Sequence, residues 1–123
     1  KKIALVTDAG TPGVSDPGSS LVSSVRQELK SQVKIESIPG ASALTAALAL
    51  VGQGFEHFLF LGFLPHKKGR ETIFKEIANS DKVVVFYESV HRIIKTLISL
   101  EKHTPDFNSF YGNLSKHQLY QFF

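Results

Sequence analysis

Short apolar runs alternate with amphipathic stretches along most of the chain. Runs of apolar and β-branched residues predict strands at residues 3–6, 33–38, 57–64 and 82–87. Apolar residues at helical spacing predict helices at residues 19–30, 41–51, 71–79 and 88–102. This alternation of strands and helices predicts an α/β fold with a largely parallel sheet.

The expected helix at residues 41–51 differs from the others in composition. Its sequence, ASALTAALALV, is apolar on most faces, and Gly52 follows it. We therefore expect this helix to be buried and to end at the glycine. Beyond residue 103 the sequence has no clear period, so a strand and an irregular tail remain alternatives there.

The composition narrows the classes of function. The chain has 123 residues, of which 42% are hydrophobic, and a formal net charge of +3. This positive charge is too small to establish a nucleic-acid partner by itself. The absence of cysteine excludes disulfides and thiolate metal sites, and no apolar run reaches the roughly 18 residues of a membrane span. Methionine is absent as well, so we expect the chain to be a piece of a longer protein.

The most unusual segment is the loop TDAGTPGVSDPG, residues 7–18, which follows the first expected strand. Its density of glycine and proline excludes a helix or a sheet interior. Asp8 stands where the strand ends, and its carboxylate could accept a hydrogen bond from a hydroxyl or an amine. The loop matches neither a phosphate-binding P-loop nor a G-x-G-x-x-G fingerprint. A structural turn and a ligand-binding loop are equal alternatives from these residues alone.

Two further loops follow expected strands, where ligands bind in open parallel sheets. In IPGASALTAA, Ser42 can cap the next helix, whose free N–H groups suit a polar or anionic group. An ordinary strand–turn–helix connection is the simpler interpretation. In FYESVHR, the residues Glu88, His91 and Arg92 bring a carboxylate, an imidazole and a guanidinium to one rim. The alternative is a helix cap by Ser89 with a surface ion pair.

A basic segment, HKKGR at residues 66–70, lies in the loop after the third expected strand. It could contact phosphates, although most such charge runs are simply solvated. The histidines share no metal-ligand spacing, so we predict no metal site. No G-x-S-x-G elbow is present, so a Ser-His-Asp hydrolase is not supported.

Taken together, these loops resemble one family. The segments DAGTPGVSDPG, IPGASALTAAL, FLFLGFLPHKKGR and FYESVHR are similar to signature segments of the ribosomal RNA small-subunit methyltransferase I family, within the tetrapyrrole methylase superfamily. The resemblance implies a tetrapyrrole methylase-like α/β fold of two αβα lobes with mainly parallel sheets, both incomplete here. Residues 1–52 would belong to the first, cofactor-binding lobe. Residues 53–123 would belong to the second, with an uncertain tail after residue 103.

The resemblance also implies an activity, the 2′-O-ribose methylation of a cytidine in the decoding region of 16S ribosomal RNA, with S-adenosylmethionine as methyl donor. By position in the motifs, the cofactor-binding residues would be Asp8, Ala9, Gly10, Gly13, Ser42, Ala43 and Tyr87. The residues facing RNA would be Lys67, Lys68, Arg70 and Arg92. The catalytic residues would be Glu88 and His91. The partners implied are 16S ribosomal RNA or the small ribosomal subunit and a second copy in a homodimer, in the cytoplasm and without a membrane.

Departures from the family pattern leave other hypotheses open. The family's N-terminal part, with segments like TPIGNL and EDTR, is absent, and the resemblance fades after His103. Val90 stands where the family often has proline or a small polar residue. A sheet that lacks strands at both ends exposes its edges, so we expect the piece to be marginally stable alone. The alternatives are an inactive or weakly RNA-binding fragment, and another superfamily member that acts on a tetrapyrrole or on a modified histidine.

Overall fold

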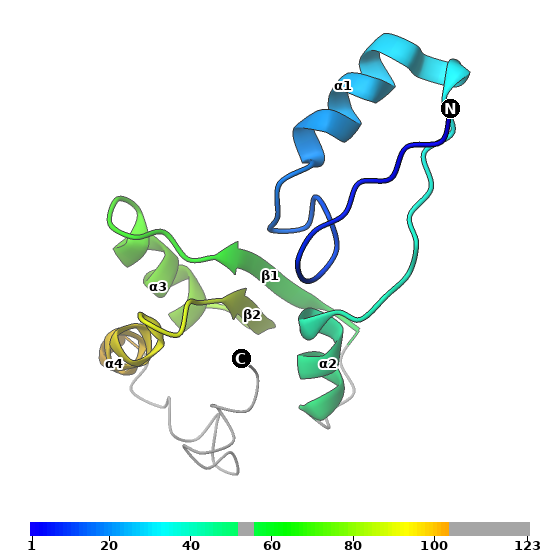
Figure 1. The fold of residues 1–123 in the computed structure, drawn as a ribbon. Helices are drawn as coiled ribbons and strands as arrows, with labels where there is room; N and C mark the ends of the chain where they lie inside the picture. The colour runs from blue at the N-terminus through cyan, green and yellow to red at the C-terminus, as the bar shows by residue number, and fades with distance from the viewer. Residues whose placement is uncertain (52–55, 104–123) are drawn as a thin grey trace. The chain divides into compact units, whose positions relative to one another are not determined.

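The computed structural model describes residues 1–51 and 56–103 of the chain. The chain divides into two compact units, Lys1–Gly52 and Gln53–Phe123. The first contains helix α1 (Ser19–Leu29), the short 3₁₀ helix η1 (Lys30–Gln32) and helix α2 (Ala43–Leu50) (Figure 1). The second contains β1 (Phe58–Phe63), α3 (Arg70–Ala78), β2 (Val83–Tyr87) and α4 (Ile93–His103). The predictions for position 52 and for the tail after residue 103 lie outside the described residues.

The second unit is built on two parallel strands. β1 and β2 pair in parallel from Phe58 opposite Val83 to Phe63 opposite Tyr87, with an irregularity in the register before the last pair. Aromatic and β-branched side chains favour such strands because they pack well on a pleated surface. The predicted strands at 57–64 and 82–87 are confirmed, as is their parallel direction.

A hydrophobic core joins the strands of this unit to its helices. Leu64, Phe74 and Leu100 are buried, and further side chains pack against them: Leu61, Ile73, Ile77 and Phe86. The cluster draws on both strands and on one face each of α3 and α4, which lie beside the strand pair (Figure 1). The helical spacing that predicts these two helices therefore marks the faces that are buried.

Helix α4 begins at Ile93, later than the start predicted at residue 88. The backbone N–H groups of Arg92 and Ile93 both donate to the Ser89 carbonyl oxygen, so residues 89–92 form a turn. The Ser89 N–H in turn donates to the side chain of Glu88 at 2.9 Å. This side-chain contact competes with an earlier start of the helix.

In the first unit, helix α1 is confirmed but the two predicted strands are wrong. Residues 3–6 and 33–38 form no strand, and Ile3 and Ile38 are 92% and 84% exposed. An apolar run becomes a strand only when its backbone N–H and C=O groups pair with a neighbouring strand. No described segment of this unit supplies such a ladder, since the sheet consists of β1 and β2.

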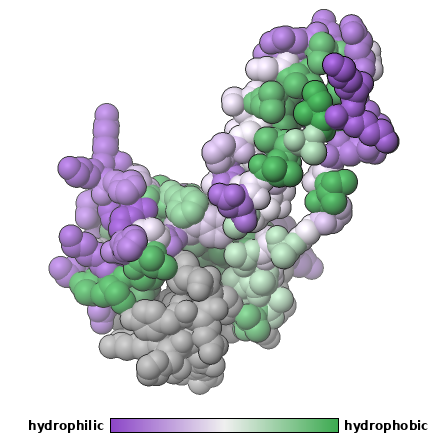
Figure 2. All heavy atoms as spheres, in the orientation of Figure 1, coloured by the Kyte–Doolittle hydropathy of each residue, from purple (hydrophilic) through white to green (hydrophobic). Residues whose placement is uncertain are grey.

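Helix α2 forms as predicted, but its expected burial is wrong. None of its residues is buried, and Leu50 is 66% exposed. A helix is buried only when a second layer packs against it, and the described residues of this unit form no sheet. Figure 2 shows apolar side chains, in green, on the surface of the unit, and Leu21 and Val33 are among those exposed.

Candidate functional site

Glu88 follows directly after β2 and lies at the centre of a polar cluster. Its side chain is 0% exposed, and a carboxylate is seldom buried without partners. Oε1 accepts from the Ser89 backbone N–H at 2.9 Å and lies 2.5 Å from Arg92 Nη2. Oε2 accepts from the Thr96 hydroxyl at 2.7 Å and lies 3.6 Å from Arg70 Nη1. Both carboxylate oxygens are therefore occupied, and the group is held between two guanidiniums.

The two arginines connect this cluster to the loop after β1. Arg70 Nη1 donates to the Pro65 carbonyl at 2.9 Å, and Arg92 Nη1 donates to the Leu64 carbonyl at 3.4 Å. The Arg70 guanidinium also lies over the Phe74 ring, 4.8 Å from its centroid. A single buried carboxylate thus helps to set the position of the loop that carries the basic segment.

A pocket of about 250 Å³ opens beside this cluster. The described residues that line it all have polar side chains: His66, Arg70, His91, Arg92, Lys95 and Ser99. His66, Arg70, His91 and Arg92 come from the segments that follow β1 and β2, at the edge where both strands have their carboxyl ends, and Lys95 and Ser99 lie further along α4. Ligands of open parallel sheets bind at this edge. We name this pocket the basic pocket.

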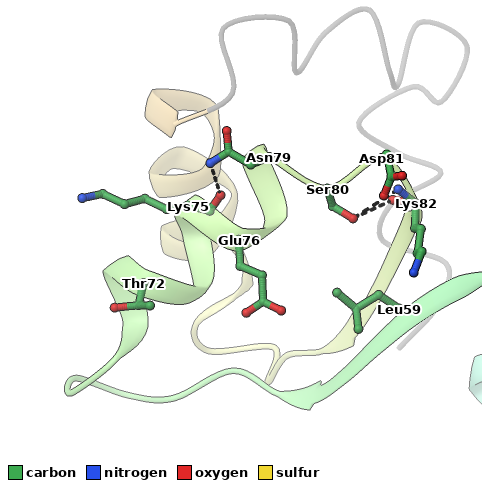
Figure 3. A pocket seen from close by; sticks show the side chains of 8 residues that line it. All are labelled: Leu59, Thr72, Lys75, Glu76, Asn79, Ser80, Asp81 and Lys82. Carbon is green, nitrogen blue, oxygen red and sulfur yellow. Dashed lines mark hydrogen bonds between the residues drawn. The ribbon is translucent and has the colours of Figure 1, made fainter.

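A second depression, of about 500 Å³, lies near the amino ends of the strands (Figure 3). It is lined by Leu59, by side chains of α3 and by the turn before β2. Figure 3 shows Lys75, Glu76 and Lys82 around it, so acidic and basic groups are mixed there. The basic pocket is the better candidate site, because its charge has one sign and its edge is the usual one.

The loop of residues 7–18 is stabilised by its own hydrogen bonds. The Thr7 hydroxyl donates to the Asp16 carboxylate at 2.9 Å. Gly10 has a φ of +74°, a conformation that favours glycine. A Cβ at Gly10 would meet no atom within 4 Å, so the backbone there is open to a ligand. The loop therefore fits both alternatives that its sequence allows. Its internal hydrogen bonds are those of a structural turn, and its accessible backbone suits a ligand-binding loop.

The other predicted cofactor-binding residues of the first unit lie in two loops. Asp8 and Ala9 are exposed, and Gly13 is half-buried, with its N–H donating to Pro17. Ser42 is the N-cap of α2, as predicted, and its hydroxyl accepts from the Thr45 N–H at 3.5 Å. Ala43 is the first residue of that helix. The roles of these residues in cofactor binding stay predictions.

Tyr87, the remaining predicted cofactor residue, ends β2 in the second unit. Its ring meets the Phe60 ring edge-on with centroids 5.1 Å apart, and it also contacts the ring of Phe63. These contacts fix the ring on the strand pair. Its role toward the cofactor likewise stays a prediction.

The residues predicted to face RNA fall into two groups. Lys67 and Lys68 are exposed in the loop after β1. Arg70 and Arg92 are half-buried and both contact Glu88, so part of each guanidinium is engaged within the protein. Their RNA-binding role stays a prediction, and so do the catalytic roles of Glu88 and of the exposed His91.

Sequence reasoning assigned no role to Thr96, Lys95 or Ser99, although the structure brings all of them to the cluster or to the pocket. A signal was present for the α4 residues. Arg92, Lys95 and Ser99 follow one another at intervals of three and four, which places them on one helix face.

Among residues 1–51 and 56–103, no His, Asp and Glu side chains gather as metal ligands, and no helix is long and apolar enough to cross a membrane.

Comparison with known proteins relates the chain to one enzyme family. The model of the tetrapyrrole (corrin/porphyrin) methylases matches residues 1–111. The chain belongs to the tetrapyrrole methylase family. The resemblance found in the loops is thereby confirmed, and the α/β class of the fold with it.

Several proteins named ribosomal RNA small subunit methyltransferase I are similar to this tetrapyrrole methylase chain. The protein of Thermotoga maritima is 42% identical over 97 residues, which make up 79% of this chain and 42% of that protein. That of Pasteurella multocida is 46% identical over 101 residues, 81% of this chain and 35% of that protein. That of Leptospira biflexa is 45% identical over 109 residues, 86% of this chain and 43% of that protein. The chain thus spans less than half the length of these relatives.

Proposed function

We propose that the protein methylates the ribose 2′-oxygen of a cytidine in the decoding region of 16S ribosomal RNA, with S-adenosylmethionine as methyl donor. The observation that carries the proposal is the 42–46% identity to relatives named ribosomal RNA small subunit methyltransferase I. The matched family region, residues 1–111, includes both the loop of residues 7–18 and the basic pocket. The cationic side chains that line that pocket, Arg70, Arg92 and Lys95, suit a polyanion such as RNA.

The residues present in the loops fit S-adenosylmethionine. Asp8 is exposed and could accept from a ribose hydroxyl or an amino group. The open backbone at Gly10 admits close approach of a ligand, as a side chain there would not. The Ser42 hydroxyl accepts from Thr45 and still has its own proton to donate. We assign these residues, with Ala9, Gly13, Ala43 and Tyr87, to cofactor binding.

The chemistry asks two things of the protein. When bound, S-adenosylmethionine supplies a methyl group on a positively charged sulfur. The protein must align the ribose hydroxyl in line with that carbon–sulfur bond, and alignment is the larger part of such catalysis. The hydroxyl must also lose its proton as the carbon–oxygen bond forms, so a nearby base assists.

Two side chains are candidates for this proton transfer, and their environments differ. His91 is exposed on the rim of the basic pocket, whereas both oxygens of Glu88 are occupied in the interior. We therefore assign proton transfer to His91 and the positioning of Arg70 and Arg92 to Glu88. Exchanging Glu88 and His91 together should abolish turnover while cofactor binding is mostly retained. Unchanged turnover would refute both roles.

The experiment that tests the proposed function is methyl transfer to isolated small ribosomal subunits. The 123-residue chain is incubated with unmethylated subunits and S-adenosylmethionine labelled in its methyl group. We expect label in the RNA, and mass spectrometry of the nuclease digest should identify it as 2′-O-methylcytidine. Label in another nucleoside would refute the assigned target. A folded chain that binds the cofactor but transfers no methyl group would refute the activity for this chain.

A second candidate function, RNA binding without methyl transfer, is favoured by one observation. The hydrophobic core and the basic pocket lie in the same unit, whereas the first unit, which carries most of the predicted cofactor residues, has no buried residue among those described. Calorimetric titration with S-adenosylmethionine distinguishes the two functions, because only the methyltransferase requires binding of this cofactor.

A ribosomal RNA substrate would also place the protein in the cytoplasm. The homodimer implied by the resemblance stays a prediction.

A further inference from the structure

We propose that the basic pocket binds a phosphodiester group of the RNA backbone and thereby holds the substrate strand in register. The inference rests on the proposed function in one respect, the choice of RNA as the polyanion. It adds Lys95 and His66 to the residues assigned to contact with the substrate. It also gives the arginines a ligand of defined chemistry.

The charges at the pocket favour an anion. Of the described residues that line it, three carry a positive charge, Arg70, Arg92 and Lys95, and none is acidic. The one carboxylate nearby, Glu88, is 0% exposed. Three positive charges less one negative charge leave +2 with both imidazoles neutral. Glu88 therefore orders the guanidiniums and leaves a net positive charge for a ligand to meet.

The donors at the pocket suit phosphate oxygens. Arg92 Nη1 and Nη2 are engaged with Leu64 and Glu88, but its Nε is buried and has no hydrogen-bond partner among the described residues. A buried N–H without an acceptor is unfavourable, and an acceptor oxygen would satisfy it. Arginine presents its donors in a planar fork that matches phosphate, and such charge-assisted hydrogen bonds are strong. The imidazoles of His66 and His91 add ring nitrogens at the same rim, whereas the Ser99 hydroxyl donates to the Lys95 carbonyl oxygen at 2.8 Å.

The size and the lining of the pocket indicate which part of RNA enters it. Its volume of about 250 Å³ lies below the roughly 300–1,000 Å³ of pockets that enclose a whole small ligand. Among the described residues its lining holds no Phe, Tyr or Trp ring, and its guanidiniums and lysine suit the oxygens of a phosphate. It therefore suits the phosphate group rather than the nucleobase.

The surroundings of the pocket favour a polymer over a single anion. Lys67 and Lys68 are exposed in the same loop as His66, and the Arg70 backbone N–H donates to the Lys67 carbonyl at 3.2 Å. This turn presents two further positive charges next to the pocket. A continuous polyanion could contact them together with the pocket, whereas a small anion could not.

The test is the salt dependence of binding to a single-stranded RNA oligonucleotide, followed by fluorescence anisotropy with the full chain. Lys95→Ala removes one proposed phosphate contact. Each such contact contributes about 0.7 to the slope of log K against log salt for single strands. We expect the slope to fall by about 0.7, which corresponds to roughly fivefold weaker binding at 0.1 M salt. Lys75→Ala, an exposed lysine at the other depression, is the matched control and should leave the slope unchanged.

A second readout keeps the result independent of folding defects. Dimethyl phosphate is titrated into labelled protein, and the side-chain Nε–H signal of Arg92 is followed by NMR. We expect this signal to shift in the parent chain and in Lys75→Ala, and to shift less in Lys95→Ala. One combination of results would indicate a small-anion site and overturn the inference. In that case inorganic phosphate binds the pocket tightly, and RNA binding is equally strong in the two variants. Equal losses of RNA affinity in the two variants would also overturn it.

The outcome can be separated from that of the proposed function. Methyl transfer to ribosomal RNA combined with an unaffected salt slope in Lys95→Ala would refute the pocket and leave the methyltransferase standing. A reduced slope in Lys95→Ala, with no cofactor binding by the parent chain, would refute the methyltransferase and leave the phosphate pocket standing.

Discussion

Glu88 and Arg92 form an ion pair in the interior of the second unit, with Glu88 Oε1 2.5 Å from Arg92 Nη2 and the Glu88 side chain 0% exposed. The two residues stand at positions i and i+4, on either side of the turn that leads into α4. The contact ties the end of β2 to the start of that helix. The same carboxylate holds Arg70, so one buried group connects both loops at the carboxyl ends of the strands.

The first prediction concerns the removal of this buried charge. Glu88→Gln leaves two guanidiniums without their counter-charge, and breaking a buried pair in this way is strongly destabilising. Because the arginine side chains are 16% and 21% exposed, water can partly replace the carboxylate. We expect a loss of about 2–3 kcal/mol in the free energy of unfolding, measured by urea denaturation.

The matched control is Glu71→Gln. Glu71 contacts His103 at 2.8 Å but its side chain is 73% exposed. Exposed pairs contribute about 0–1 kcal/mol, so this variant should unfold close to the parent. Equal effects of the two variants would contradict the central position of Glu88.

The second prediction concerns the Thr96 hydroxyl, which donates to Glu88 and accepts from Arg70. Thr96 is 0% exposed, so water cannot replace these contacts without a change in packing. Thr96→Val keeps the shape but leaves one carboxylate oxygen without its donor, at a cost of about 1–3 kcal/mol in unfolding. Thr72→Val, at an exposed position of α3, should change stability by no more than about 0.5 kcal/mol.

The third prediction concerns the backbone of the loop of residues 7–18. Gly10→Ala forces a side chain into a φ of +74° but meets no neighbouring atom, so the cost is backbone strain of about 1 kcal/mol. Hydrogen exchange of the Val14 amide, which donates to the Thr11 carbonyl, should quicken by roughly fivefold. Gly40→Ala is the control, because the space there is also open and its φ lies outside the strained region. Unchanged exchange in Gly10→Ala would show that the turn does not require glycine.

The fourth prediction separates ligand binding from stability in the same loop. Asp8 is exposed and makes no ion pair or side-chain hydrogen bond among the described residues, so Asp8→Ala should leave thermal unfolding unchanged. Asp16 accepts from Thr7, and Asp16→Ala should loosen the loop. If Asp8 contacts the cofactor, its variant should weaken S-adenosylmethionine binding in calorimetry by about tenfold, since hydrogen bonds to charged groups contribute roughly 1.5–3 kcal/mol. Full affinity in Asp8→Ala would remove this residue from the site.

The sequence by itself determined the local elements and the family. The periodicity of apolar residues predicted the α-helices of the described residues, although not the 3₁₀ helix η1, since an α-helix pairs its own backbone and needs only one apolar face. The β-branched and aromatic runs predicted β1 and β2, and the joint occurrence of the loop motifs predicted the tetrapyrrole methylase family. The capping role of Ser42 was also predictable, because a cap depends on residues within one turn.

Only the tertiary structure decided which apolar segments pair and which side chains meet. The apolar run at residues 3–6 predicts a strand as clearly as the run at residues 83–87 does. A strand forms only beside a partner strand, and the sequence does not say whether one is present. Glu88 and Arg70 lie far apart in the chain, so their ion pair depends on the parallel crossover from β1 through α3 to β2. Burial of the Glu88 carboxylate, and with it the free donors at the basic pocket, follows from that packing and not from any local pattern.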